Sequence, residues 1–143
     1  MVFRSGATGQ HKVWEEFKSL PIISVAPVRR PLLNEAGTEY VLNMEKDFMR
    51  EKIRMVLRIA AHQQHKELCI GPFGAGPGIL NPAPLIATMW REILFEEFQG
   101  VFSSVVFAIE SAADSYLREG ASTIFNAFKQ EFDPSNIAKT TYR

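Results

Sequence analysis

Three segments of the chain repeat apolar side chains at spacings of three and four residues, which is the pattern of one helical face. In residues 41–64 this face alternates with charged positions and comprises Met44, Phe48, Met49, Ile53, Val56, Leu57 and Ala60. The second segment runs from Leu85 to Phe98 and the third from Ala121 to Phe132. Gly100 and Asp133-Pro134 follow these two segments as stop signals. The pattern therefore predicts three amphipathic helices.

Short apolar runs between these segments predict strands. Pro21–Ala26 is rich in β-branched residues and ends at Pro27, and Leu68–Gly71 precedes a glycine-rich stretch. Val105–Ile109 is apolar without alternation, which is typical of a strand buried on both faces of a parallel sheet. Another short strand is expected at Val2–Arg4.

Strands that alternate with helices predict an α/β fold with a mostly parallel sheet and right-handed crossovers. The expected architecture is a three-layer α/β/α sandwich. With 143 residues the chain fits one domain, which we expect over residues 1–134. The remaining residues, 135–143, are polar and are expected to form a loose tail.

Composition narrows the classes of partner. The 16 basic and 16 acidic residues cancel, so the chain lacks the basic excess that favours nucleic acid or a membrane surface. No apolar run approaches the roughly 20 residues of a membrane helix, and no signal peptide is visible. The single cysteine, Cys69, is expected to be an inert core residue. These features predict an intracellular protein, cytoplasmic or nuclear.

The stretch from Gly71 to Asn81 carries the candidate chemistry. It follows a predicted strand and leads into a predicted helix, and ligands of open parallel sheets bind at that edge. Its glycines allow close approach of a ligand, and backbone N–H groups at a helix start suit a phosphate or diphosphate. Asn81 and Pro82 are expected to be the N-cap and the first helical position. The spacing matches neither the dinucleotide fingerprint nor the Walker loop, so a crossover that binds nothing is the alternative.

Side chains other than the glycines are further candidates for a ligand site. Arg29 and Arg30 follow a predicted strand end, where they would either meet a phosphate or lie in a surface loop. Phe73 is the aromatic residue expected to stack on a ligand. His62 and His65 have no third ligand at metal spacing, so neither a metal nor another cofactor is expected.

Taken in order, these segments resemble the C-terminal half of the microbial-type poly(ADP-ribose) glycohydrolase family, whose domain is a macrodomain. Residues 21–31 are similar to the family's strand and alanine-proline loop, and 49–61 to its central helix. Residues 68–82 are similar to its phosphate loop and 98–109 to its last core strand. The resemblance implies that ADP-ribose or a related nucleotide is the partner. It also implies a set of ligand-binding residues: Gly71, Phe73, Gly74, Ala75, Gly76, Gly78 and Asn81.

The family's catalytic segment, a glycine run followed by Gln-Glu-Glu, is absent from this chain. Glu15-Glu16 lacks the preceding glycines and falls in the wrong order, so no catalytic residue is assigned. The favoured function is therefore ADP-ribose binding without turnover. Glycohydrolase activity of the microbial type is one alternative. Another is a structural remnant that associates through its sheet edge, as a homo-oligomer or with a partner subunit, because missing strands leave an edge exposed. The sequence leaves open whether the gene product is longer.

Overall fold

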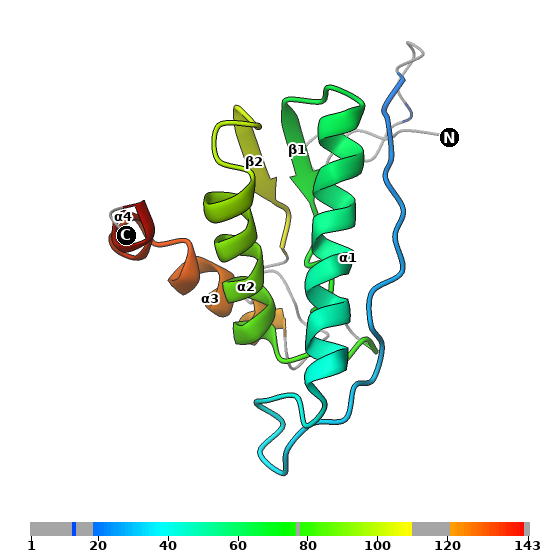
Figure 1. The fold of residues 1–143 in the computed structure, drawn as a ribbon, viewed down its shortest axis with the longest axis vertical. Helices are drawn as coiled ribbons and strands as arrows, with labels where there is room; N and C mark the ends of the chain where they lie inside the picture. The colour runs from blue at the N-terminus through cyan, green and yellow to red at the C-terminus, as the bar shows by residue number, and fades with distance from the viewer. Residues whose placement is uncertain (1–12, 14–18, 77, 110–120, 142–143) are drawn as a thin grey trace.

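The computed structural model of the protein describes residues 13, 19–76, 78–109 and 121–141. Two parallel strands and several helices make up this part, so the fold class is α/β (Figure 1). The elements follow in the order α1 (Asn43–His62), β1 (Glu67–Ile70), α2 (Ala83–Glu92), the π-helical turn η2 (Ile93–Glu97), β2 (Ser104–Phe107), α3 (Ala121–Glu131) and α4 (Pro134–Thr141). The strand expected at Val2–Arg4 and the Glu15-Glu16 pair lie outside the described residues.

The three helices that periodicity predicts are confirmed as α1, α2 with η2, and α3. Their apolar faces meet in one core, in which Trp90 of α2 is completely buried. The fully buried large side chains of this core are Met49, Ile53, Leu57, Ile86, Met89, Trp90 and Ile93. Burial of these faces, rather than helix propensity, stabilises helices of such length.

Ion pairs join α1 to the helix that follows β1. Arg50 Nη1 lies 2.7 Å from Glu92 Oε2, and Arg54 Nη2 lies 2.6 Å from Glu97 Oε1. In η2 the N–H of Phe98 donates to the carbonyl of Ile93, which is the five-residue step of a π-helix. In an α-helix, Glu97 would lie roughly 140° around the helix axis from Glu92, five residues earlier. The wider π-helical turn reduces this angle, so Glu97 and Glu92 lie on the same side of the helix and both face α1.

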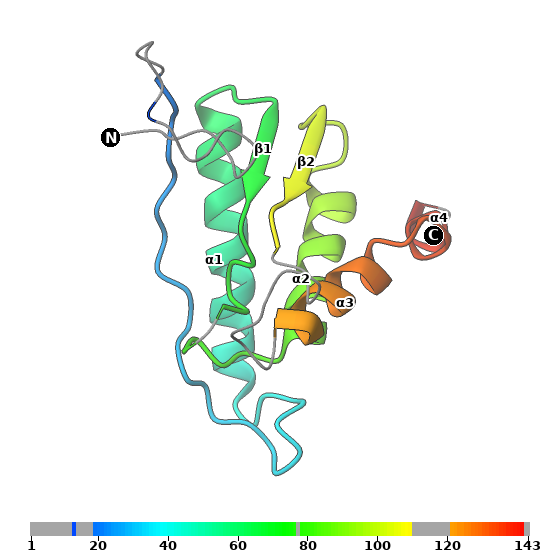
Figure 2. The ribbon, with the colours of Figure 1, turned by 180° about the vertical axis from the view of Figure 1, so that it is seen from behind.

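The sheet pairs β1 with β2 in parallel, with Leu68 opposite Val105 and Ile70 opposite Phe107. These four side chains pack on the core. The two opposite views draw the strands behind α1 and α2 in Figure 1 and in front of them in Figure 2, so these helices share one face.

The other face of this sheet is exposed in the described part. Val106 is 55% exposed, and Cys69 is also exposed. The strand expected at Val105–Ile109 is therefore not buried on both faces, and Cys69 is not a core residue. Both expectations were wrong. Side chains alternate between the faces of a strand, and the described helices cover only one of them. The third layer of the expected sandwich stays a prediction.

The segment Pro21–Ala26 is not a strand, contrary to the sequence-based expectation. In the described part of the chain, this segment forms no strand pairing, and the side chains of Leu20 and Ile22 are exposed. The nearest regular pairing is an isolated antiparallel bridge between Leu33 and Tyr40. β-Branched residues favour an extended backbone, but a strand also needs a neighbouring strand edge to bond.

The C-terminal residues were expected to be loose, and this was wrong, because residues 134–141 form α4. Asp133 precedes the helix, and its Oδ1 accepts a hydrogen bond from the Ser135 N–H at 2.9 Å. Pro134 occupies the first helical position, where its missing N–H has no cost. The domain boundary at residue 134 stays a prediction. None of the helices in the described part is long and apolar enough to cross a membrane.

Candidate functional site

The glycine-rich loop follows the carboxyl end of β1 and leads directly into α2, as its position in the sequence predicts. The described residues of this loop are 71–76 and 78–82. We call Gly74 and Ala75 its inner turn, and Gly71, Gly76 and Gly78 its outer rim. The inner turn, Gly74 and Ala75, is buried, whereas Gly71 on the rim is exposed and Gly76 and Gly78 are half-buried.

Gly74 anchors the loop against the core. Its φ of +93° lies in the left-handed region that favours glycine. A Cβ atom built there would lie 2.6 Å from Met49 Cε and 3.2 Å from Ile86 Cδ1. Gly74 is therefore required by close packing against α1 and α2, and it offers no open surface to a ligand.

The rim glycines are different, because a Cβ atom at Gly71, Gly76 or Gly78 would meet no atom of the described residues within 4 Å, apart from its chain neighbours. Gly78 has a φ of +78°, so the backbone turns there in the left-handed region. Open space beside glycine backbone is what close approach of a ligand requires. The rim is thus the part of the loop that can receive one.

Asn81 is buried, with 6% of its surface exposed, and it does not cap α2. The N-cap is Pro82, without a side-chain hydrogen bond, so the expected Asn81 cap was wrong. The Asn81 Nδ2 donates to the carbonyls of Val28 and Gly74, both at 2.8 Å. This amide therefore ties the loop to the segment that precedes α1, and both of its hydrogens are already used.

The remaining amide oxygen of Asn81 accepts a 2.7 Å hydrogen bond from the Tyr40 hydroxyl. Tyr40 is buried, and burial raises the pKa of its hydroxyl above the ordinary value, with the Glu45 carboxylate adding to the effect. Sequence reasoning missed Tyr40, because a single tyrosine 41 residues before its partner gives no periodic or spacing signal.

Arg29 and Arg30 lie against the loop, although it is some 50 positions away in sequence. Arg29 Nε donates to the Gly78 carbonyl at 3.2 Å, and the Arg30 N–H donates to the Ile79 carbonyl at 2.6 Å. Both arginines are exposed. The structure therefore brings the Arg29 guanidinium to the glycine rim, and its contact with a phosphate stays a prediction.

Two non-glycine residues have a left-handed backbone conformation where the arginine segment contacts the loop. Arg30 has a φ of +53° and Leu80 a φ of +67°. Such conformations cost about 1–3 kcal/mol each and concentrate where the surrounding structure imposes them. Here they flank the contact between the arginine segment and the loop.

Phe73 and Ala75, both expected to bind a ligand, have roles in packing. The Phe73 ring meets Trp90 edge-on with centroids 6.2 Å apart, and its carbonyl accepts from Trp90 Nε1 at 3.2 Å. Ala75 is 6% exposed. Phe73 is only half-buried, so stacking of its ring on a ligand stays a prediction.

Residues 71–82 contain no acidic side chain, and Arg29 adds a cation at the rim. Within the described residues no three side chains of His, Cys, Asp or Glu gather where a metal could bind. Such a site can bind an anion through backbone N–H groups and a guanidinium, and its loop supplies no general acid or base.

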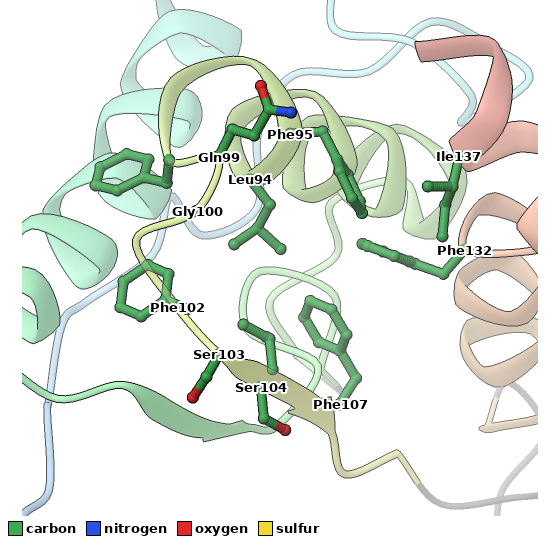
Figure 3. Close-up of a pocket in the computed structure, with 12 residues that line it drawn as sticks. Leu94, Phe95, Gln99, Gly100, Phe102, Ser103, Ser104, Phe107, Phe132 and Ile137 are labelled. Atoms are coloured by element: carbon green, nitrogen blue, oxygen red, sulfur yellow. The ribbon is translucent and has the colours of Figure 1, made fainter. Parts of the chain in front are cut away.

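A cavity of about 610 Å³ lies elsewhere, between η2, β2, α3 and α4 (Figure 3). Aromatic and aliphatic side chains dominate its wall, including Leu94, Phe95, Phe98, Phe102, Phe107, Phe132 and Ile137. Ser103, Ser104 and Gln99 supply its polar groups. None of the predicted ligand-binding residues lines it. The cavity was not predictable from the sequence, because its phenylalanines fit ordinary helix and strand patterns.

Comparison of the chain with protein-family models, with curated proteins and with solved structures found no match.

Proposed function

We propose that this protein binds the diphosphate of ADP-ribose, or of a related nucleotide, on the rim of the loop formed by residues 71–82, and that it does so without turnover. The observation that carries the proposal is the contact of Arg29 Nε with the Gly78 carbonyl. It holds a guanidinium at Gly78, one of the three rim glycines beside which a Cβ atom would meet nothing among the described residues within 4 Å. Arginine binds phosphate oxygens in a bidentate manner, and glycine backbone lets those oxygens approach.

The start of α2 supports the same ligand chemistry. Its N-cap makes no side-chain hydrogen bond, and its first turn carries no acidic residue. The positive end of the helix dipole is therefore left for an anion. Pro82 and Pro84 remove two N–H donors, which makes the Arg29 charge the more important part of the site.

Binding rather than hydrolysis is proposed because the loop contains no carboxylate and the family's Gln-Glu-Glu segment is absent. Cleavage of a glycosidic bond needs a group that protonates the leaving oxygen or activates water. The resemblance also supports a macrodomain as the finer fold, with a further layer over the face that carries Val106.

Isothermal titration calorimetry with ADP-ribose tests the proposal. Gly76→Glu adds a negative charge and a side chain where the native structure has room, so it should abolish binding without unfolding the protein. Gln99→Glu adds the same charge outside the loop at an exposed residue and should bind as the wild type does. Arg29→Ala should weaken binding by roughly ten- to a hundredfold, as expected for one charge-assisted hydrogen bond.

Saturable binding that is lost in Gly76→Glu and kept in Gln99→Glu would support the site. Absence of binding by the wild type at millimolar ADP-ribose would refute the function. Release of ADP-ribose from a modified protein by the wild type would refute the absence of turnover and favour the hydrolase.

The exposed sheet face favours a second candidate function, association through the sheet. Val106 projects from this face, and large exposed apolar side chains on a sheet risk pairing with another chain. A dimer that dissociates in Val106→Glu, and that is indifferent to nucleotide, would support this candidate.

A further inference from the structure

The helix α1 has a second apolar face, which points away from the core. Met44, Phe48, Met55 and Ile59 are between 37% and 60% exposed. At about 100° per residue, these four side chains fall within about 60° of one another. The core residues Met49, Ile53 and Leu57 lie on the opposite side of the helix. We call the four exposed residues the α1 stripe.

A solvent-facing helix surface is normally polar, so the α1 stripe needs an explanation. Its residues are spaced by four, seven and four positions, which is close to the repeat by which two helices pack along a shared seam. Methionine and phenylalanine are also enriched at protein interfaces, and methionine adapts its shape to a partner.

Charges at the borders of the stripe indicate which partner fits. Glu51 and Lys52 fill the interval between Phe48 and Met55. At about 100° per residue, they lie roughly 50° to either side of the centre line of the stripe, at the same height. Glu51 is thus on one border, where its half-exposed carboxylate also pairs with Arg54 and Arg58 of the same helix, and Lys52 is on the other.

Two copies of α1 packed in parallel and in register place Glu51 of each copy against Lys52 of the other. Antiparallel packing about the same centre places Glu51 beside Glu51 of the second copy and Lys52 beside Lys52 of the second copy. Both pairs carry like charges and repel each other. Opposite charges at flanking positions select partner and orientation in paired helices, whereas like charges oppose pairing.

We propose that a second copy of this chain docks on the α1 stripe, with the two α1 helices parallel and in register. The proposal is independent of the ligand of the glycine loop. The loop abuts α1 at Met49, so parallel packing leaves both loops at the same end of the dimer.

Sedimentation equilibrium over roughly 1 µM to 1 mM protein tests the pairing, since even weak dimers form within this range. The wild type should dimerise, and Phe48→Glu and Met55→Glu should be monomeric with an unchanged circular dichroism spectrum. Leu32→Glu, at a similarly exposed apolar residue outside the α1 stripe and the sheet, should dimerise as the wild type does. A dimer lost only in Val106→Glu would overturn the proposal in favour of the sheet.

Charge exchange tests the partner. Glu51→Lys and Lys52→Glu should each weaken the dimer about tenfold or more, and the double variant should recover it, because the exchanged charges face each other again. Misfolding would not be rescued in this way. A wild type that stays monomeric throughout would overturn the proposal and leave the stripe to a helix of another protein.

Disulfide cross-linking tests the orientation. In a Cys69→Ser background, Met55→Cys alone should form a covalent dimer on oxidation, because parallel helices place Met55 beside its own copy. Cross-linking that requires Phe48→Cys in one chain and Met55→Cys in the other would show an antiparallel pair and overturn the parallel arrangement.

Discussion

The Tyr40 hydroxyl donates a 2.7 Å hydrogen bond to the side-chain oxygen of Asn81, and this buried contact completes the hydrogen bonding of the Asn81 amide. One side chain thereby connects α1's leading segment, the Val28 carbonyl and the inner turn of the glycine loop. The position of the loop depends on this connection more than on the start of α2.

Asn81→Ala should therefore destabilise the protein by about 3 kcal/mol, since buried groups left without partners cost about 1–3 kcal/mol each. Tyr40→Phe, which orphans a single amide oxygen, should cost about 1–2 kcal/mol. Urea unfolding of both variants and of the double variant measures these values. The double variant should lose less than the sum, and strict additivity would show that the two residues do not act together.

Stability at alkaline pH should reveal the raised pKa of Tyr40. An unfolded tyrosine loses its proton near pH 10, whereas the folded Tyr40 keeps it to higher pH. The contribution to the free energy of unfolding is therefore fully present below about pH 10 and falls as the pH rises further. Subtracting the pH profile of Tyr40→Phe removes the titration of lysines, and a difference that stays flat above pH 10 would contradict this prediction.

Substitution by alanine should destabilise the protein at Gly74, in the inner turn, and have little effect at Gly76, on the rim. Gly74→Ala forces a side chain onto Met49 and Ile86 at a left-handed φ, and should cost about 2 kcal/mol. Gly76→Ala enters open space and should change the free energy of unfolding by less than about 0.5 kcal/mol. Thermal melts of the pair compare the two positions, and equal losses would mean that the inner turn is not anchored as described.

Relief of the left-handed backbone at Leu80 should stabilise the protein. This exposed leucine has a φ of +67°, a conformation that asparagine tolerates better. Leu80→Asn should raise the free energy of unfolding by about 0.5–1 kcal/mol. Leu32→Asn replaces a similarly exposed leucine that is not left-handed and should bring no such gain. Equal effects of the two changes would mean that the gain comes from replacing an exposed apolar side chain and not from the backbone conformation.

Low pH should weaken the ion pair between Arg54 of α1 and Glu97 of η2. The hydrogen bond from Arg54 is the main cause that lowers the pKa of the Glu97 carboxyl. A lowered folded pKa contributes stability above the ordinary carboxyl value, and this is lost as the pH falls through the folded value. Because the Glu97 side chain is 34% exposed, the loss in Glu97→Gln at neutral pH should stay below about 1 kcal/mol. Glu96→Gln at the exposed neighbour is the control, and in chemical unfolding the Glu97 effect should shrink as the pH falls below the ordinary carboxyl pKa.

The sequence predicted the helices because their signal is local. Met49, Ile53 and Leu57 mark the core face of α1 through spacing alone, and the structure buries all three. The position of the glycine loop between a strand and a helix was predictable for the same reason. The same spacing puts Met44 and Phe48 on the core face, and this was wrong, because the structure leaves both side chains exposed.

Tertiary structure decided what local signals leave open. Pro21–Ala26 has the composition of a strand, but pairing depends on an edge supplied by another part of the chain. Asn81 has the position of a helix cap, yet its amide turns inward because carbonyls from Val28 and Gly74 converge on it. Contacts across 40–50 positions also bring Tyr40 and Arg29 to the loop. Sequence spacing determined the three amphipathic helices and the strand before the glycine loop, and only the packing of distant segments determined which side chains hold the loop and which face solvent.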